Sequence, residues 1–395
     1  MPSDALYPRY DHAVACCLRA AVWAEPCPQS LRALLQEKDF WKAAYRQSCG
    51  HLLAVWALDN HLIDAGESLK IQVFAIYQRT MRQNRLLTDL LTLFGQHDIP
   101  AVLLKGYGLS LLYPSPEMRE YGDIDLYIGE QNYDRATAFL RASFPDAYWF
   151  SEEYVGHHFL MQLDANRDLV AEFHNIAMDL PGMPRAEKAF NDFCEHELTP
   201  LRTVRLNETD IPIPSVRFNA LYVFVHAWHH FENNGVGLRQ LADWMLCLHQ
   251  LAHTLTEEER QTFEAELKGF LQQMSMLDIW QTFGCVLVAH LGLSKAEFPL
   301  YRSACEKRGE RLYRQILHDG HGYRFANRQS GAIIHTFPLR RPEHNRLLQR
   351  LYTALRIPYD AFQLAKIFPR LAFRRFCGNI RLGFRRLFSR RYTKP

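Results

Sequence analysis

Two long parts of the chain show the spacing of amphipathic helices, one before residue 98 and one after residue 215. In the first part, Leu52, Val55 and Trp56 begin an apolar series that continues over 73–94. Apolar side chains three and four positions apart lie on one face of a helix, so we expect one buried face along this part. In the second part the same spacing predicts helices over 216–231, 238–251, 257–273, 277–291, 302–318 and 343–368.

The stretch between these parts has short apolar runs separated by turn residues. They predict helices at 107–112 and 132–143 and strands at 101–104, 123–128, 157–163 and 169–174. The order β-α-β-α-β-β implies a small mixed sheet with helices against it. The predicted fold class is therefore α+β, with a helical N-terminal segment and a helical C-terminal half.

The composition is that of a folded globular protein, with 48% hydrophobic and 23% charged residues. No run approaches eighteen uncharged apolar residues, so no membrane span is predicted. The first residues include acidic side chains and lack an apolar stretch, which argues against a signal peptide. Nine cysteines occur without a Cys-x-x-Cys pair, as expected for reduced thiols in the cytoplasm.

Charge is distributed unevenly along the chain. Residues 340–395 contain fifteen Lys and Arg but two acidic residues, a net of +13, whereas the whole chain carries +3. Arginines alternate there with Leu and Phe, as in a basic amphipathic helix. Such a helix suits an anionic membrane surface or a nucleic-acid backbone, and a docked terminal helix with solvated arginines is the alternative.

Two aspartates interrupt the apolar run GDIDLYI at 122–128. Asp is disfavoured in strands, yet Asp123 and Asp125 both lie in this run. Alternate residues of a strand face the same side, which places the two carboxylates roughly 6–7 Å apart. Like charges that close repel unless a cation lies between them, and Mg²⁺ prefers oxygen ligands. The pair predicts a metal site at a strand end, and solvated aspartates on an edge strand are the alternative.

Lys105 and Gly106 end the preceding apolar run. Glycine permits close approach of the backbone to a ligand, and the N-terminus of the next helix is suited to phosphate oxygens. Lys105 would add a positive charge to a triphosphate. The alternative is a simple strand-to-helix turn.

Glu172 and His174 share one face of the strand predicted at 169–174. A two-metal site needs a third anionic ligand on a neighbouring strand, and Glu172 is the candidate. The alternative is a solvent-facing Glu beside a structural His.

His226 and His230 lie four residues apart on one face of a predicted helix. Without an intervening catalytic Glu this spacing is weak evidence for zinc, and histidines that line a cleft are the favoured interpretation. On the next helix Arg239 either pairs with Asp243, four residues later, or reaches a phosphate.

The motifs LLKG at 103–106, GDIDLYI at 122–128 and AEFH at 171–174, with Arg119 in the spacer, resemble the nucleotidyltransferase superfamily with the polymerase-beta-like catalytic core. More narrowly, they are similar to a large, mostly uncharacterised bacterial nucleotidyltransferase family that carries LKG…R..GDIDLLV and a later E-h-H. The segment HHF…GVGLRQLADW is similar to that family's helical half, so the resemblance covers roughly residues 85 to 250.

The resemblance implies transfer of an NMP group from an NTP, with ATP the expected nucleotide, to an acceptor hydroxyl or phosphate, with release of pyrophosphate. It implies two Mg²⁺ ions bound by the catalytic carboxylates Asp123, Asp125 and Glu172. The superfamily's usual Gly-Ser after the first strand is replaced here by Lys105-Gly106, a departure shared by the narrower family. The residues expected at the nucleotide or the acceptor are Lys105, Gly106, Gly122, Arg119, His174 and Arg239.

The predicted organisation is a helical segment at 1–98, the catalytic core at 99–210, a helical domain forming the other cleft wall at 211–339, and a basic helical segment at 340–395. We expect a cytoplasmic protein whose basic end meets an anionic partner, either a membrane surface or nucleic acid. Two other functions stay open. One is a catalytically inactive nucleotide-binding or interaction protein, and the other is a nucleic-acid-modifying transferase that uses the Arg-rich end.

Overall fold

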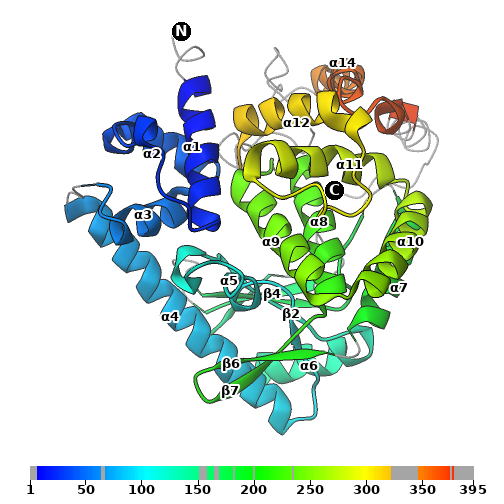
Figure 1. The fold of residues 1–395 in the computed structure, drawn as a ribbon. Coiled ribbons are helices and arrows are strands. Elements are labelled where there is room, and N and C mark those ends of the chain that lie inside the picture. The colour runs from blue at the N-terminus through cyan, green and yellow to red at the C-terminus, as the bar shows by residue number, and fades with distance from the viewer. Residues whose placement is uncertain are drawn as a thin grey trace.

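The computed structural model describes residues 7–63, 67–150, 158–163, 169–180, 183–198, 201–233, 235–321, 346–373 and 376–377. Helices form the larger part of the molecule and lie around a single five-stranded sheet (Figure 1). The predicted α+β fold class is confirmed.

The sheet has the strand order β1-β2-β5-β4-β3. Strands β2 and β5 are parallel and the other neighbours are antiparallel, so the sheet is mixed, as predicted. Its strands are β1 (Val102–Leu103), β2 (Ile124–Tyr127), β3 (Tyr148–Phe150), β4 (His158–Gln162) and β5 (Val170–His174). The sequence pattern does not predict β3, because three residues are too few to show alternation.

A second, two-stranded sheet was also not predicted. Strands β6 (Arg202–Leu206) and β7 (Thr209–Ile213) form an antiparallel hairpin, and β7 packs beside β1. Pro212 within β7 and charged residues in β6 hide the strand signal, because both are uncommon in strands.

Most helices from residue 67 onward form where apolar spacing predicted them, but the helix at 184–197 was not predicted. The helices are α1 (Tyr7–Val22), α2 (Lys38–Arg46), α3 (Gly50–Asp59), α4 (Glu67–Gln96), α5 (Tyr107–Ser110), α6 (Glu130–Ser143), α7 (Pro184–Glu197), α8 (Val216–Asn233), α9 (Leu238–Thr254), α10 (Glu257–Gln273), α11 (Leu277–Val286), α12 (Glu306–Asp319) and α14 (Arg346–Ala365). Helix α11 continues into a π-helical turn, η5 (Leu287–Leu291).

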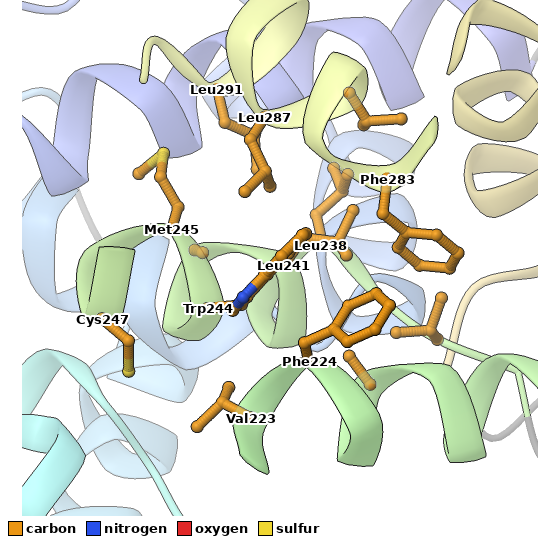
Figure 2. Packing of buried hydrophobic residues seen from close by; sticks show 14 of the residues in the cluster. Val223, Phe224, Leu238, Leu241, Trp244, Met245, Cys247, Phe283, Leu287 and Leu291 are labelled. Carbon is orange, nitrogen blue, oxygen red and sulfur yellow. The ribbon is translucent and has the colours of Figure 1, made fainter. Parts of the chain in front are cut away.

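Two hydrophobic cores organise these elements. The larger core joins α1–α3 to α8–α12, so helices from both ends of the chain pack together. Trp244 of α9 is fully buried in it and packs against Phe224 of α8, which in turn contacts Phe283 of α11 (Figure 2). The buried indole donates a hydrogen bond to the Ala220 carbonyl at 2.9 Å. The smaller core lies between the sheet, α6 and the C-terminal half of α4.

The expectation of one buried face along residues 73–94 is correct for only half of α4. Leu90 and Phe94 are fully buried against the sheet, but Phe74 is 63% exposed. Helix α4 is longer than the sheet it covers, and its N-terminal half extends past it (Figure 1). Amphipathic spacing shows which side of a helix is apolar but not how far its partner extends.

Within the described residues no single helix is both long and apolar enough to cross a membrane. One helix pair, α10 with α11–η5, meets those criteria by length and composition alone, and its two helices are bent by 118° relative to each other. Most arginines of the predicted basic segment, from Arg374 onward, lie outside the described residues.

Candidate active site

Three carboxylates meet where β2 and β5 run side by side. The parallel register sets Asp125 directly opposite Glu172, and Asp123 immediately precedes β2. Carboxylate oxygens from all three residues lie within 4.8 Å of one another. The structure therefore brings together the three acidic residues that the sequence singled out.

Mutual repulsion and burial shape the charge of this cluster. The nearby charge of Asp125 and then burial raise the pKa of Asp123, and burial raises the pKa of Glu172 well above its ordinary value. Burial alone would also raise the pKa of Asp125, but Lys105 and His174 outweigh it and hold that pKa below its usual range. Asp125 Oδ2 is buried and accepts no hydrogen bond from the described residues. An oxygen of this kind, with two further carboxylates beside it, fits a hard divalent cation.

Lys105 joins the carboxylates to the helical wall. Its Nζ lies 3.0 Å from Asp125 Oδ1 and 2.9 Å from His226 Nε2 on α8. Burial by itself lowers the pKa of Lys105, but Asp125 and the two other carboxylates outweigh it and raise that pKa. Because an ammonium group only donates, His226 Nε2 must accept, which puts the proton of this neutral ring on Nδ1.

Gly106 and Gly122 meet different requirements. Gly106 has φ +56°, a conformation that side chains other than glycine rarely adopt. The helix that follows it, α5, has only four residues, so the expected helix N-terminus contributes little dipole to phosphate binding. A Cβ on Gly122 would meet no atom within 4 Å, and its carbonyl accepts a hydrogen bond from Gln83 Nε2 at 3.1 Å.

Arg119 is held inside the protein. Its Nε and Nη2 donate to the two carboxylate oxygens of Asp243, at 2.7 and 3.0 Å, and its Nη1 donates to the Gly106 carbonyl at 3.1 Å. Tyr113 Oη donates to the same carboxylate at 2.7 Å. Burial raises the pKa of Asp243, but Arg119 and Arg239 outweigh it, so the group stays ionised. Arg119 thus connects the Gly106 turn to α9.

Arg239 forms the intrahelical ion pair with Asp243, one of the two interactions expected for it. Its Nη1 donates to Asp243 Oδ2 at 3.0 Å. Unlike Arg119, which is buried, Arg239 reaches the cavity while partly exposed. It remains available to an anionic ligand through the rest of its guanidinium group.

Two histidines border the carboxylates on the sheet. His174 Nε2 lies 3.3 Å from Asp125 Oδ1 and 3.7 Å from Glu172 Oε2. His158 stands opposite His174 in the β4–β5 register, 3.6 Å from Glu172 Oε2. Burial, then the neighbouring His174, lowers the pKa of His158 to about 4. His158 was missed by sequence reasoning, although the hairpin register that pairs it with His174 was the available signal.

A cavity of about 400 Å³ separates the carboxylates from the helical wall. His226, His229 and His230 of α8 line that wall, together with His321 after α12. Burial holds the pKa of His226 and of His230 well below the ordinary range, so both rings are neutral at pH 7. Among the described residues, no third ligand completes a metal site with His226 and His230. These histidines line a cleft, the interpretation favoured from the sequence.

Comparison with known protein families identifies the class of reaction to which this chain belongs. A family model described as an uncharacterised nucleotidyltransferase matches residues 54–275, more than half of the chain. The chain belongs to this nucleotidyltransferase family. No curated protein and no solved structure matches it. The resemblance to a nucleotidyltransferase family is confirmed, and the protein is a transferase of nucleotidyl groups.

The match covers the lining of this cavity except for His321. It begins within α3 and ends after α10, so it includes the three carboxylates, Lys105 and the histidines of α8. His321 lies outside the match, yet its Nδ1 is 2.7 Å from Gln240 Nε2 of α9. Sequence reasoning had no signal for His321, because only packing of the larger core brings residue 321 to this cavity.

Proposed function

We propose that this nucleotidyltransferase uses Mg²⁺ to transfer an NMP group from an NTP, with ATP as the expected donor, to an acceptor hydroxyl or phosphate. The observation that supports the proposal is the convergence of Asp123, Asp125 and Glu172, with Asp125 Oδ2 left without a hydrogen bond among the described residues. In the reaction an acceptor oxygen bonds to the α-phosphorus, the bond from that phosphorus to the bridging oxygen breaks, and pyrophosphate leaves.

The three carboxylates would hold two Mg²⁺ ions. When bound, the ions stabilise negative charge on the phosphates and favour the deprotonated acceptor oxygen. His174 donates to Asp125 Oδ1 and so orients this carboxylate. Arg119 holds the Gly106 turn and Asp243 in place, which is a positioning role.

The remaining polar groups are suited to the phosphates and the acceptor. Lys105 lies at the carboxylates, and a triphosphate oxygen would compete for its ammonium group. Gly106 and Gly122 present backbone without a side chain beside the cavity. Arg239 is the partly exposed cation of the opposite wall, where it suits an acceptor or the leaving pyrophosphate.

The test is Mg²⁺-dependent release of pyrophosphate, measured with each of the four NTPs and a panel of acceptors. We expect Glu172→Gln to lower kcat at least about a hundredfold, since loss of a ligand exceeds the 10–100-fold effects of changes around ligands. Glu208→Gln is the matched control, because Glu208 is 99% exposed at the β6–β7 turn.

The double variant Asp123→Asn, Asp125→Asn decides the mechanism. It should keep the wild-type circular dichroism spectrum and lose turnover. Undiminished pyrophosphate release in this variant would refute the assignment of the carboxylates. If wild-type protein binds ATP with Mg²⁺ but forms no product with any acceptor, the inactive nucleotide-binding alternative is favoured instead, for which the ion pair of Lys105 with Asp125 is the supporting contact.

A further inference from the structure

A second group of metal-ligating side chains lies on α9, away from the cavity. His249 and His253 are one helical turn apart near the C-terminal end of α9, and Glu297 faces them from the segment after η5. His249 lies ten residues beyond Arg239, which is about 15 Å along the helix axis. The group shares no residue with the candidate active site.

Both imidazoles converge on one oxygen atom. His249 Nδ1 and His253 Nε2 each lie 2.9 Å from Glu297 Oε1, and the three ligand atoms lie within 4.8 Å of one another. In a tetrahedral zinc site the ligand atoms lie about 2.0–2.1 Å from the metal and so roughly 3.3 Å apart. The distance from Glu297 Oε1 to each ring nitrogen therefore differs from this spacing by only a few tenths of an ångström, and the two nitrogens lie within 4.8 Å of one another.

The carboxylate is already oriented for this role. The backbone N–H of Ser294 donates to Glu297 Oε2 at 3.1 Å, which leaves Oε1 for the histidines. Burial raises the pKa of Glu297, but this hydrogen bond and those from His253 and His249 outweigh it and keep the group ionised. Such a contact behind a ligand is typical of metal sites.

The larger core holds the His249 ring in position. His249 packs edge to face against Trp23, at 4.9 Å between ring centroids, and Trp23 Nε1 donates to the Leu291 carbonyl at 2.7 Å. His253 is 64% exposed, so a fourth position open to water lies on the solvent side. Two imidazoles, one carboxylate and an open position are a ligand set suited to Zn²⁺.

We propose that His249, His253 and Glu297 bind a divalent transition-metal ion, with Zn²⁺ the expected occupant. The ion links the C-terminal end of α9 to the segment that follows η5. Trp23, directly after α1, contacts the His249 ring and the Leu291 carbonyl of η5. A bound ion therefore stabilises the junction of the N-terminal and C-terminal helices.

The experiment measures Zn²⁺ binding to the full chain by calorimetry, in the presence of saturating Mg²⁺. The variant is His253→Gln, because this exposed side chain contributes little to packing. His196→Gln is the matched control, since His196 is an 86% exposed histidine at the end of α7 beside Glu197. We expect His253→Gln to weaken one Zn²⁺ site at least about tenfold, and His196→Gln to leave it unchanged.

Zinc also has potential ligands at His158, Glu172 and His174, so a second variant separates the two sites. Glu172→Gln should weaken the other Zn²⁺ equivalent and keep the one that His253→Gln loses. Zn²⁺ should raise the thermal midpoint of wild-type protein, and this rise should be absent from both His253→Gln and Glu297→Gln. Equal Zn²⁺ affinity in wild-type protein and His253→Gln, or an unchanged thermal shift in both variants, would overturn the proposal.

Discussion

Replacing Arg119 by methionine tests whether this residue supports the fold or binds phosphate. Arg119 is 4% exposed, and its side chain makes two hydrogen bonds to Asp243 and one to the Gly106 carbonyl. Methionine fills a similar volume but leaves the buried carboxylate with a missing partner. Removing one member of a buried ion pair costs about 3–5 kcal/mol.

The remaining contacts of Asp243 set the expected value within this range. Tyr113 and Arg239 still donate to the carboxylate, so we expect the lower end, about 3 kcal/mol of the free energy of unfolding. Urea denaturation followed by tryptophan fluorescence measures this quantity. Adding Asp243→Asn to the Arg119→Met variant should cost less than the sum of the two single changes, because the unpaired charge is then removed.

Arg79→Met is the matched control. Arg79 pairs with Glu120 at 3.3 Å in a partly exposed position, where ion pairs contribute about 0–1 kcal/mol. If Arg119→Met lost less than about 1 kcal/mol while its KM for the nucleotide rose, the positioning role would be refuted and direct phosphate binding favoured.

Two further predictions concern the cavity. Burial and the two aspartates raise the pKa of Glu172, so Mg²⁺ has to displace a proton when the pH is below that pKa. The affinity of the protein for Mg²⁺ should therefore rise with pH until the pKa is passed, and the released proton should appear as a buffer-dependent binding enthalpy that Glu172→Gln abolishes. A Mg²⁺ affinity that does not change with pH would contradict this. Gly106→Ala should lower the free energy of unfolding by about 1–3 kcal/mol because Gly106 has a positive φ. Gly269→Ala in α10, where a Cβ meets open space, should instead stabilise the protein by up to about 1 kcal/mol. Denaturation midpoints of the two variants that move in the same direction would refute the conformational argument.

Much of the candidate active site could be predicted because strand geometry is a local property. Alternation along β2 and β5 fixes which carboxylates share a face, and the run around Asp123 and Asp125 identified the strand end. The third carboxylate required one further step, the pairing of β2 with β5, which the motif AEFH suggested. The fold class followed from the same patterns.

The local periodicity of the chain by itself determined where most helices and strands form and which acidic residues share a strand face, and the motifs around Lys105, Asp123 and Glu172 indicated the family. Only the tertiary structure decided that Lys105 bridges Asp125 and His226, that Arg119 is enclosed by Asp243, and that the first helices pack with the last. Those contacts join residues more than a hundred positions apart or depend on register between elements. Side-chain packing and burial select them, and no repeating pattern along the chain records that choice.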